Sequence, residues 1–198
     1  MATRATQVIL PVWNPPLPAG VSLLTATEFT EKYNDQRYEL VKGRLQETPM
    51  PGQKHGKICL KIGASLLQHT EANDLGHVTS NDSFIQTGFN PDTIRGPDVC
   101  YFSFERLPRG PIPEGILPVN PELVIEVRSP SNTWSELFSK VGEYLRAGVL
   151  AVVILDSETS TASVFRPNVL QQIIHAAEML TVPEILPGWA VQVGKLFE

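Results

Sequence analysis

The chain has 198 residues, of which 42% are hydrophobic and 19% are charged, a composition typical of one globular domain with a sizeable core. No apolar run approaches the roughly 20 residues that a membrane span needs, and the first residues lack the layout of a secretory signal. We therefore expect a cytoplasmic protein without a membrane partner. The net charge of −5 argues against a protein that coats nucleic acid through bulk electrostatics.

The N-terminal part divides into an arm and the start of a domain. Residues 1–24 are rich in proline and show no periodicity, so they predict an extended arm, and residues 25–198 predict a single domain. A helix is expected to begin after Thr25 or Thr27, because either residue can cap it and Glu28 would lie in its first turn.

The middle of the chain predicts a hairpin, a helix and two strands. Gly43 allows the reversal within a hairpin over residues 37–47, and apolar residues at helical spacing predict a long core helix over residues 55–69. Strands are expected over residues 77–89 and 97–104, separated by the turn Asn90-Pro91-Asp92.

The second half alternates strand and helix. A proline-rich loop over residues 105–120 is followed by expected strands at 123–127, 149–155 and 161–165, with a helix at 133–147 between the first two. The tail from Gln171 predicts one more strand and an extended closing segment. Together these elements predict an α/β (α+β) fold in which helices flank a mixed sheet.

Two acids lie within otherwise apolar strands. Asp98 follows Pro97 at the start of one strand, and Glu126 interrupts another. Burying a carboxylate costs free energy unless it is paired or bound to a metal, so the two acids suggest one shared cation. Two oxygen ligands and water suit Mg²⁺ or Mn²⁺. The alternative is a pair of acids bonded to arginine or to backbone amides.

Lys140 lies on the helix expected after Glu126. At 100° per residue it falls on the flank of the apolar stripe, beside Leu137 and Tyr144, from which it could reach carboxylates on the strands. The alternative is an ion pair with Glu136 on the helix surface.

Five sequence blocks follow one another along the chain: RYELVKGRLQE, HGKICLKIGASL, GPDVCYFSFERLP, PELVIEVRSPSN and KVGEYLRAGVLAVVILDSET. In this order they resemble the Uma-two family of restriction endonucleases, over about residues 25 to 197. The family is similar in fold to the PD-(D/E)XK nucleases, so the resemblance implies a restriction-endonuclease-like core. It also implies that Asp98 and Glu126 are metal ligands, with Mg²⁺ or Mn²⁺ as the cofactor.

The resemblance implies further roles around this pair. The superfamily usually has lysine two residues after the second acid, where this chain has Arg128; in the Uma-two pattern the lysine is displaced onto the next helix, at Lys140. Arg128 stays protonated and could hold a phosphate. Glu39 matches an acid on the early hairpin and could complete the catalytic site. His55, at the start of the core helix, could help bind phosphate or be a capping or surface residue.

The implied activity is hydrolysis of a nucleic-acid phosphodiester, with DNA as the expected substrate, by in-line attack of water. The ion would activate that water, and Lys140 would orient or deprotonate it. Because many such nucleases cut two strands by pairing two sites, the resemblance also implies a homodimer.

Two other functions compete with the nuclease. A protein of the same fold without activity could bind DNA or another protein, which the acidic charge and Arg128 favour. A small-molecule enzyme or binding protein has less support, because the chain contains no glycine-rich phosphate loop and neither Ser129 nor Ser131 lies in a nucleophile motif. Cys59 and Cys100 are expected to be buried free thiols, since they lie among apolar neighbours.

Overall fold

A computed structural model describes residues 22–198 except residues 34, 81 and 82. The central feature is a six-stranded sheet in the order β10-β9-β8-β7-β6-β3, in which β7 and β8 are parallel and the other neighbouring pairs antiparallel. Its strands are β3 (Gly76–Ser80), β6 (Val99–Ser103), β7 (Leu123–Arg128), β8 (Ala151–Asp156), β9 (Thr161–Phe165) and β10 (Gln172–Ile174). The arm was predicted over residues 1–24, and residues 1–21 of it lie outside the described part of the chain.

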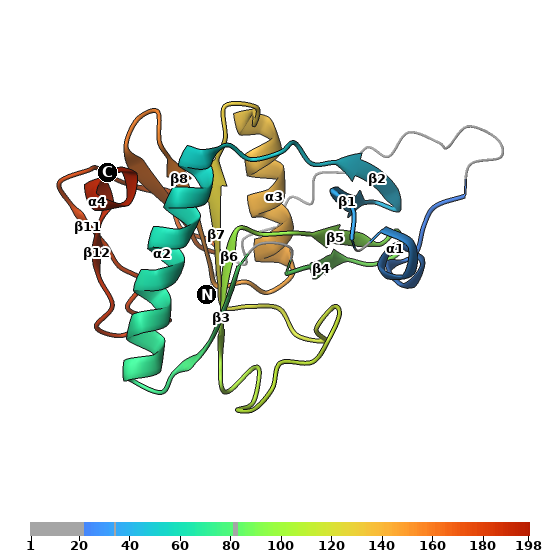
Figure 1. Cartoon of the computed structure of the whole chain (residues 1–198), viewed down its shortest axis with the longest axis horizontal. Coiled ribbons are helices and arrows are strands. Elements are labelled where there is room, and N and C mark those ends of the chain that lie inside the picture. Colours follow the sequence, from blue (N-terminus) through green and yellow to red (C-terminus); the bar gives the residue numbers. More distant parts are fainter. Residues whose placement is uncertain (1–21, 34, 81–82) are drawn as a thin grey trace, which may run out of the picture.

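Two helices cover opposite faces of this sheet: α2 (Gln53–Ala72) and α3 (Trp134–Arg146) (Figure 1). On β7, Ile125 packs in the core beneath α2, whereas Val124 packs in the core beneath α3. Because side chains alternate along a strand, Glu126 lies on the same face as Val124 and points toward α3. The expected mixed sheet with flanking helices is thereby confirmed.

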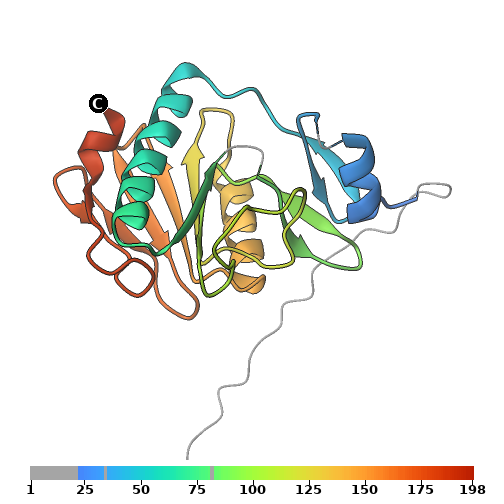
Figure 2. The ribbon, with the colours of Figure 1, turned by 60° about the horizontal axis from the view of Figure 1, so that its bottom comes forward.

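A smaller four-stranded sheet lies at one end of the molecule, in the order β2-β1-β5-β4 (Figure 2). Its strands are β1 (Tyr38–Val41), β2 (Arg44–Glu47), β4 (Ile85–Gly88) and β5 (Thr93–Arg95). α1 (Ala26–Tyr33) buries Phe29 against Leu40 and Ile94 of this sheet. The predicted hairpin is present, and Gly43 has φ +73° at its reversal.

The prediction of a single strand over residues 77–89 is wrong. The chain there forms two strands in different sheets: β3 pairs with β6, and β4 pairs with β5. The turn at residues 90–92 therefore joins β4 to β5 rather than two long strands. Local alternation cannot indicate this division, because it depends on which distant strand each half pairs with.

The C-terminal segment contains more regular structure than expected. Besides β10 it forms β11 (Met179–Leu180), β12 (Val191–Gln192) and α4 (Val193–Phe197), where only one strand was predicted. α4 buries Val193 and Leu196 in the core beneath α2. Such short elements carry little periodicity, and tertiary packing stabilises them.

α3 begins at a complete capping box. The Thr133 side chain accepts from the Glu136 backbone N–H at 3.2 Å, and the Glu136 carboxylate accepts from the Thr133 N–H at 2.8 Å. These bonds satisfy amides that the helix itself leaves unpaired. They also fix where the helix that carries Lys140 starts.

We predict that Thr133→Ala lowers the free energy of unfolding by about 1 kcal/mol, because the helix loses its capping oxygen. Urea denaturation measures the change. Ser135→Ala, at an exposed position in the same turn, is the control and should leave the midpoint nearly unchanged. Equal midpoints for the two variants would contradict the prediction.

Candidate active site

A cavity of about 510 Å³ lies between the small sheet and the ends of the interior strands β6 and β7 of the large sheet. Its lining comes from segments far apart in the sequence, namely β1, the start of α2, the β5–β6 connection, β7 and α3. Five of its lining residues are those expected from the sequence to carry chemistry: Glu39, His55, Asp98, Glu126 and Lys140.

Asp98 and Glu126 reach this cavity from neighbouring strands. Asp98 directly precedes β6, and its Oδ2 accepts from the Val127 backbone N–H at 2.7 Å. Glu126 is 6% exposed, and its Oε1 accepts from the Tyr144 hydroxyl at 2.6 Å. The Lys140 ammonium nitrogen lies 3.6 Å from the same Glu126 oxygen. The structure thus brings together the two acids and the lysine.

Glu39 is held by cations and an amide rather than left free. Lys140 Nζ donates to Glu39 Oε1 at 2.9 Å, Arg95 donates to Oε2 at 2.8 Å, and the Gly96 N–H donates to Oε1 at 3.1 Å. Arg95 also donates to both oxygens of Glu143, at 2.6 and 3.0 Å. With both oxygens engaged, Glu39 is placed to orient Lys140.

Ion pairs join Glu39, Glu126, Glu143, Arg95 and Lys140. Asp98 lies close enough for its charge to raise the pKa of Glu126, so the six side chains make up one charged cluster of four carboxylates and two cations.

Burial and neighbouring charge set the ionisation of the cluster. Burial raises the pKa of Glu126 to about 7; Lys140 lowers this pKa, and the charges of Asp98 and Glu39 raise it. Burial also acts to raise the pKa of Glu39, but Lys140 and Arg95 outweigh it and hold that pKa below its ordinary value. Burial acts to lower the pKa of Lys140, yet Glu126 and Glu39 hold it above its ordinary value. Lys140 is therefore an ammonium group.

The donor set fits a hard divalent cation. Four carboxylates and two cations leave the fully ionised cluster with an excess of two negative charges, which a divalent ion would balance. Among the described residues, neither Asp98 Oδ1 nor Glu126 Oε2 accepts a hydrogen bond, so each acid keeps an oxygen free for a ligand bond. Oxygen ligands of this kind, completed by water, are those that Mg²⁺ and Mn²⁺ prefer.

His55 and Arg128, the two expected phosphate contacts, lie in different surroundings. His55 lines the cavity, and its Nε2 lies 3.3 Å from Asp98 Oδ2. Arg128 does not line the cavity, and its guanidinium pairs with Asp156 at 3.1 Å and Glu158 at 2.6 Å.

Glu136 and the two serines line the same cavity but form no ion pair or hydrogen bond with the charged cluster among the described residues, and Cys59 lies near Asp98 on the side of α2. Glu136 caps α3, and no ion pair joins it to Lys140 within the described part of the chain. Ser129 and Ser131 bond to each other, and Ser129 also bonds to Asn132, as residues of a turn. Both cysteines are buried and free, as expected.

Sequence reasoning missed Arg95, Glu143 and Tyr144 as residues of the site. Arg95 carried a weak signal, since it directly precedes Gly96-Pro97-Asp98 and a buried arginine needs an acidic partner. Tyr144 follows Lys140 by one helical turn and so shares its flank. The sequence does not identify Glu39 as the acidic partner of Arg95, because the two residues are 56 positions apart.

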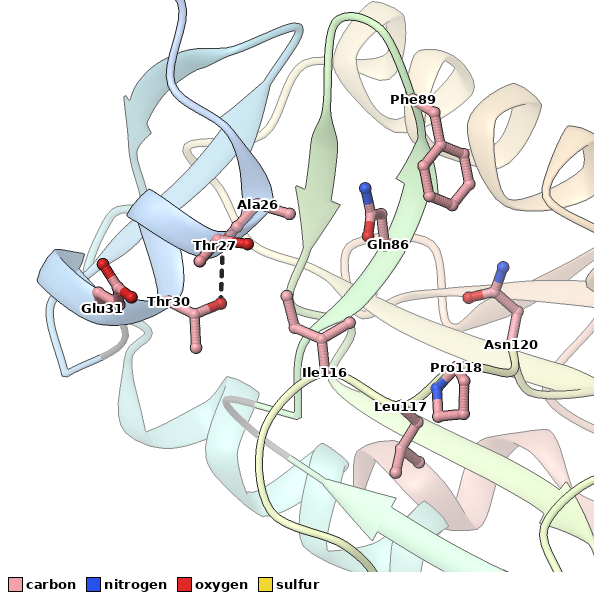
Figure 3. A pocket seen from close by; sticks show the side chains of 10 residues that line it. All are labelled: Ala26, Thr27, Thr30, Glu31, Gln86, Phe89, Ile116, Leu117, Pro118 and Asn120. Atoms are coloured by element: carbon pink, nitrogen blue, oxygen red, sulfur yellow. Dashed lines mark hydrogen bonds between the residues drawn. The ribbon is translucent and has the colours of Figure 1, made fainter.

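A second cavity, of about 580 Å³, lies between α1 and the proline-rich loop (Figure 3). Ile116 and Leu117 of that loop and Phe89 beside the β4–β5 turn give it apolar walls, and Glu31 is the single ionisable group among the described residues that line it. It therefore offers no charged pair for catalysis, and the candidate active site is the first cavity.

Comparison with known proteins gives the family. The family model Uma2, described as "Putative restriction endonuclease", matches residues 26–194, so the chain belongs to the Uma-two (Uma2) family and the resemblance noted above is confirmed. A search of curated proteins found no match. Among solved structures, "a putative nuclease belonging to DUF820 from Anabaena variabilis" is 21% identical, with a TM-score of 0.78 over 88% of this chain and 97% of that one. That likeness shows a shared fold.

None of the described helices combines the length and the apolar character needed to cross a bilayer.

We predict that Arg95→Ala lowers the free energy of unfolding by about 3–5 kcal/mol at neutral pH, because Glu39 and Glu143 lose their shared cation in a buried setting. Because the pKa of Glu39 is lowered in the folded protein, its contribution to stability is present above pH 4.5 and lost as the pH falls below it. The difference between variant and parent should therefore shrink in acid. Urea denaturation at several pH values measures it.

Arg146→Ala, an exposed arginine at the end of α3, is the matched control and should cost far less. A cost for Arg95→Ala no larger than that of the control would contradict the prediction.

Proposed function

We propose that the protein is a metal-dependent endonuclease that hydrolyses phosphodiester bonds in DNA. The observation that carries this proposal is the meeting of Asp98, Glu126 and Lys140 in one cavity. Two acids with free oxygens and one ammonium group suit a phosphodiester, whose hydrolysis builds negative charge that cations stabilise. Membership of a family described as restriction endonucleases supports the same reaction.

Asp98 and Glu126 are proposed to hold Mg²⁺ or Mn²⁺. The ion would supply a water of lowered pKa and would neutralise charge on the phosphate oxygens. The Asp98 carboxylate is oriented by the Val127 amide and the Glu126 carboxylate by the Tyr144 hydroxyl. Such outer contacts restrict the ligands to one geometry, which strengthens metal binding.

Lys140 is proposed to orient the attacking water and to stabilise charge on the reacting phosphate. Its ammonium group donates to Glu39 and lies beside Glu126, so it acts as a donor rather than as a base. Glu39 is proposed as a positioning residue, since it bonds Lys140 on one oxygen and Arg95 on the other. Arg128 is paired with two acids and does not line the cavity, and its contact with phosphate stays a prediction.

A homodimer is part of the proposal, because one site of this kind cuts one strand and a double-strand cut requires two sites. Analytical ultracentrifugation of the full chain, with and without duplex DNA, measures this. A sedimenting species of one chain mass under both conditions would exclude the dimer while leaving the proposed chemistry in place.

We predict that Asp98→Ala and Glu126→Ala each abolish Mn²⁺ binding, because each removes one of two proposed protein ligands. Isothermal titration calorimetry of the full chain measures binding. Glu114→Gln, an exposed acid in the proline-rich loop, is the control and should bind as the parent does. Undiminished Mn²⁺ affinity in both alanine variants would defeat the assignment.

We predict that the parent cleaves DNA with Mg²⁺ or Mn²⁺ and that Lys140→Gln slows cleavage by about 100-fold or more while retaining Mn²⁺ binding. Lys54→Gln, an exposed lysine near the start of α2, is the control. Duplex DNA, single-stranded DNA and RNA should be assayed together, with Asp98→Ala as the inactive reference. If the parent cleaves none of them but binds DNA, the chain is a binding module of the nuclease fold.

A further inference from the structure

One side of the candidate active site carries a different set of potential ligands. His55 and Cys59 lie four residues apart on α2 and so share one face of the helix. Cys59 Sγ lies 3.4 Å from His55 Nδ1, and His55 Nε2 lies 3.3 Å from Asp98 Oδ2. One donor atom from each of these three residues lies within 4.8 Å of the other two.

These distances suit a tetrahedral ion after a small adjustment. Ligand bonds of roughly 2.0–2.3 Å place neighbouring tetrahedral ligands roughly 3.3–3.8 Å apart, which is the separation of His55 Nε2 and Asp98 Oδ2. The three donor atoms lie within 4.8 Å of one another, so the widest separation would need to shorten by no more than about 1 Å to reach this spacing. A water from the cavity can complete the set, since His55 and Asp98 line the cavity.

The chemistry of the three groups selects a class of ion. Sulfur and imidazole nitrogen are ligands of Zn²⁺ and Co²⁺, whereas Mg²⁺ prefers oxygen and keeps its water. The acids of the proposed nuclease site offer oxygen only. The two ligand sets therefore have different ion preferences although Asp98 belongs to both.

We propose that His55, Cys59 and Asp98 form a second metal site that takes Zn²⁺ or a similar late first-row divalent ion. When the ion binds, the sulfur–metal bond replaces the S–H bond of Cys59, and the proton leaves to solvent. The Val127 amide, which bonds Asp98 Oδ2, restrains the carboxylate at the point that the two sites share.

The shared acid gives the second site a consequence for the first. An ion held by His55 and Cys59 engages Asp98 and so competes for a ligand of the Mg²⁺ or Mn²⁺ that the nuclease requires. This consequence rests on the proposed function, while the existence of the second site does not.

The test uses Co²⁺ as the probe, because a thiolate bound to Co²⁺ gives a charge-transfer absorption that oxygen ligands do not. Titration of the full parent chain should produce this absorption, and addition of Zn²⁺ should remove it. Cys59→Ser should lose the absorption, and His55→Gln should weaken Co²⁺ binding at least 10-fold. Absence of the absorption from the parent chain, or its persistence in Cys59→Ser, would overturn the proposal.

Two controls separate this site from the nuclease site. Cys100→Ala removes the other buried cysteine, which lies on β6 beneath α3, and should keep the absorption. Glu126→Gln should keep the absorption while losing Mn²⁺ binding. Failure of the proposed function would leave the cobalt–thiolate signal without Mn²⁺ binding or cleavage, and failure of the second site would leave Mn²⁺ binding and cleavage without that signal.

Discussion

The rest of the site depends on how the protein accommodates buried acids. Glu39 is 2% exposed and Glu126 is 6% exposed, and an isolated carboxylate at such depth costs several kcal/mol. Arg95 and Lys140 lower this cost by lying among the acids of the charged cluster. Because the cations are fewer than the carboxylates, the cluster keeps a negative potential that attracts a cation.

The same contacts join the two sheets. Glu39 and Arg95 belong to the small sheet, and Glu143 and Lys140 belong to α3 over the large sheet. The ion pairs that orient Lys140 are thus also contacts between the small sheet and α3. A change that loosens the small sheet is therefore expected to move the lysine, so stability and the geometry of the site are linked through Arg95.

Asp98 is the residue that the two proposed metal sites share. It lines the same cavity as the carboxylate of Glu126, and it also lies near the imidazole and thiol of α2. Under these proposals, the ion that binds Asp98 is set by which neighbouring donors bind it too, because hard and soft ions prefer different donors. The position of α2 relative to β6 and β7 thus determines which potential metal ligands lie near Asp98.

Local patterns in the sequence were sufficient for much of this protein. Apolar periodicity predicted α2, α3 and most strands of the large sheet, and the cost of acids within apolar strands singled out Asp98 and Glu126. The position of Lys140 on the flank of the apolar stripe of its helix correctly predicted that the side chain faces the strands. These features depend on residues close in sequence, whose spacing sets the face on which each side chain lies.

Tertiary structure alone decided which residues meet. It divided residues 77–89 between two sheets, paired Glu39 with Arg95, directed Arg128 toward Asp156 and Glu158, and brought α2 close enough for His55 and Cys59 to approach Asp98. Each of these contacts joins residues distant along the chain. Their formation depends on strand pairing and layer packing, which no local window of sequence encodes.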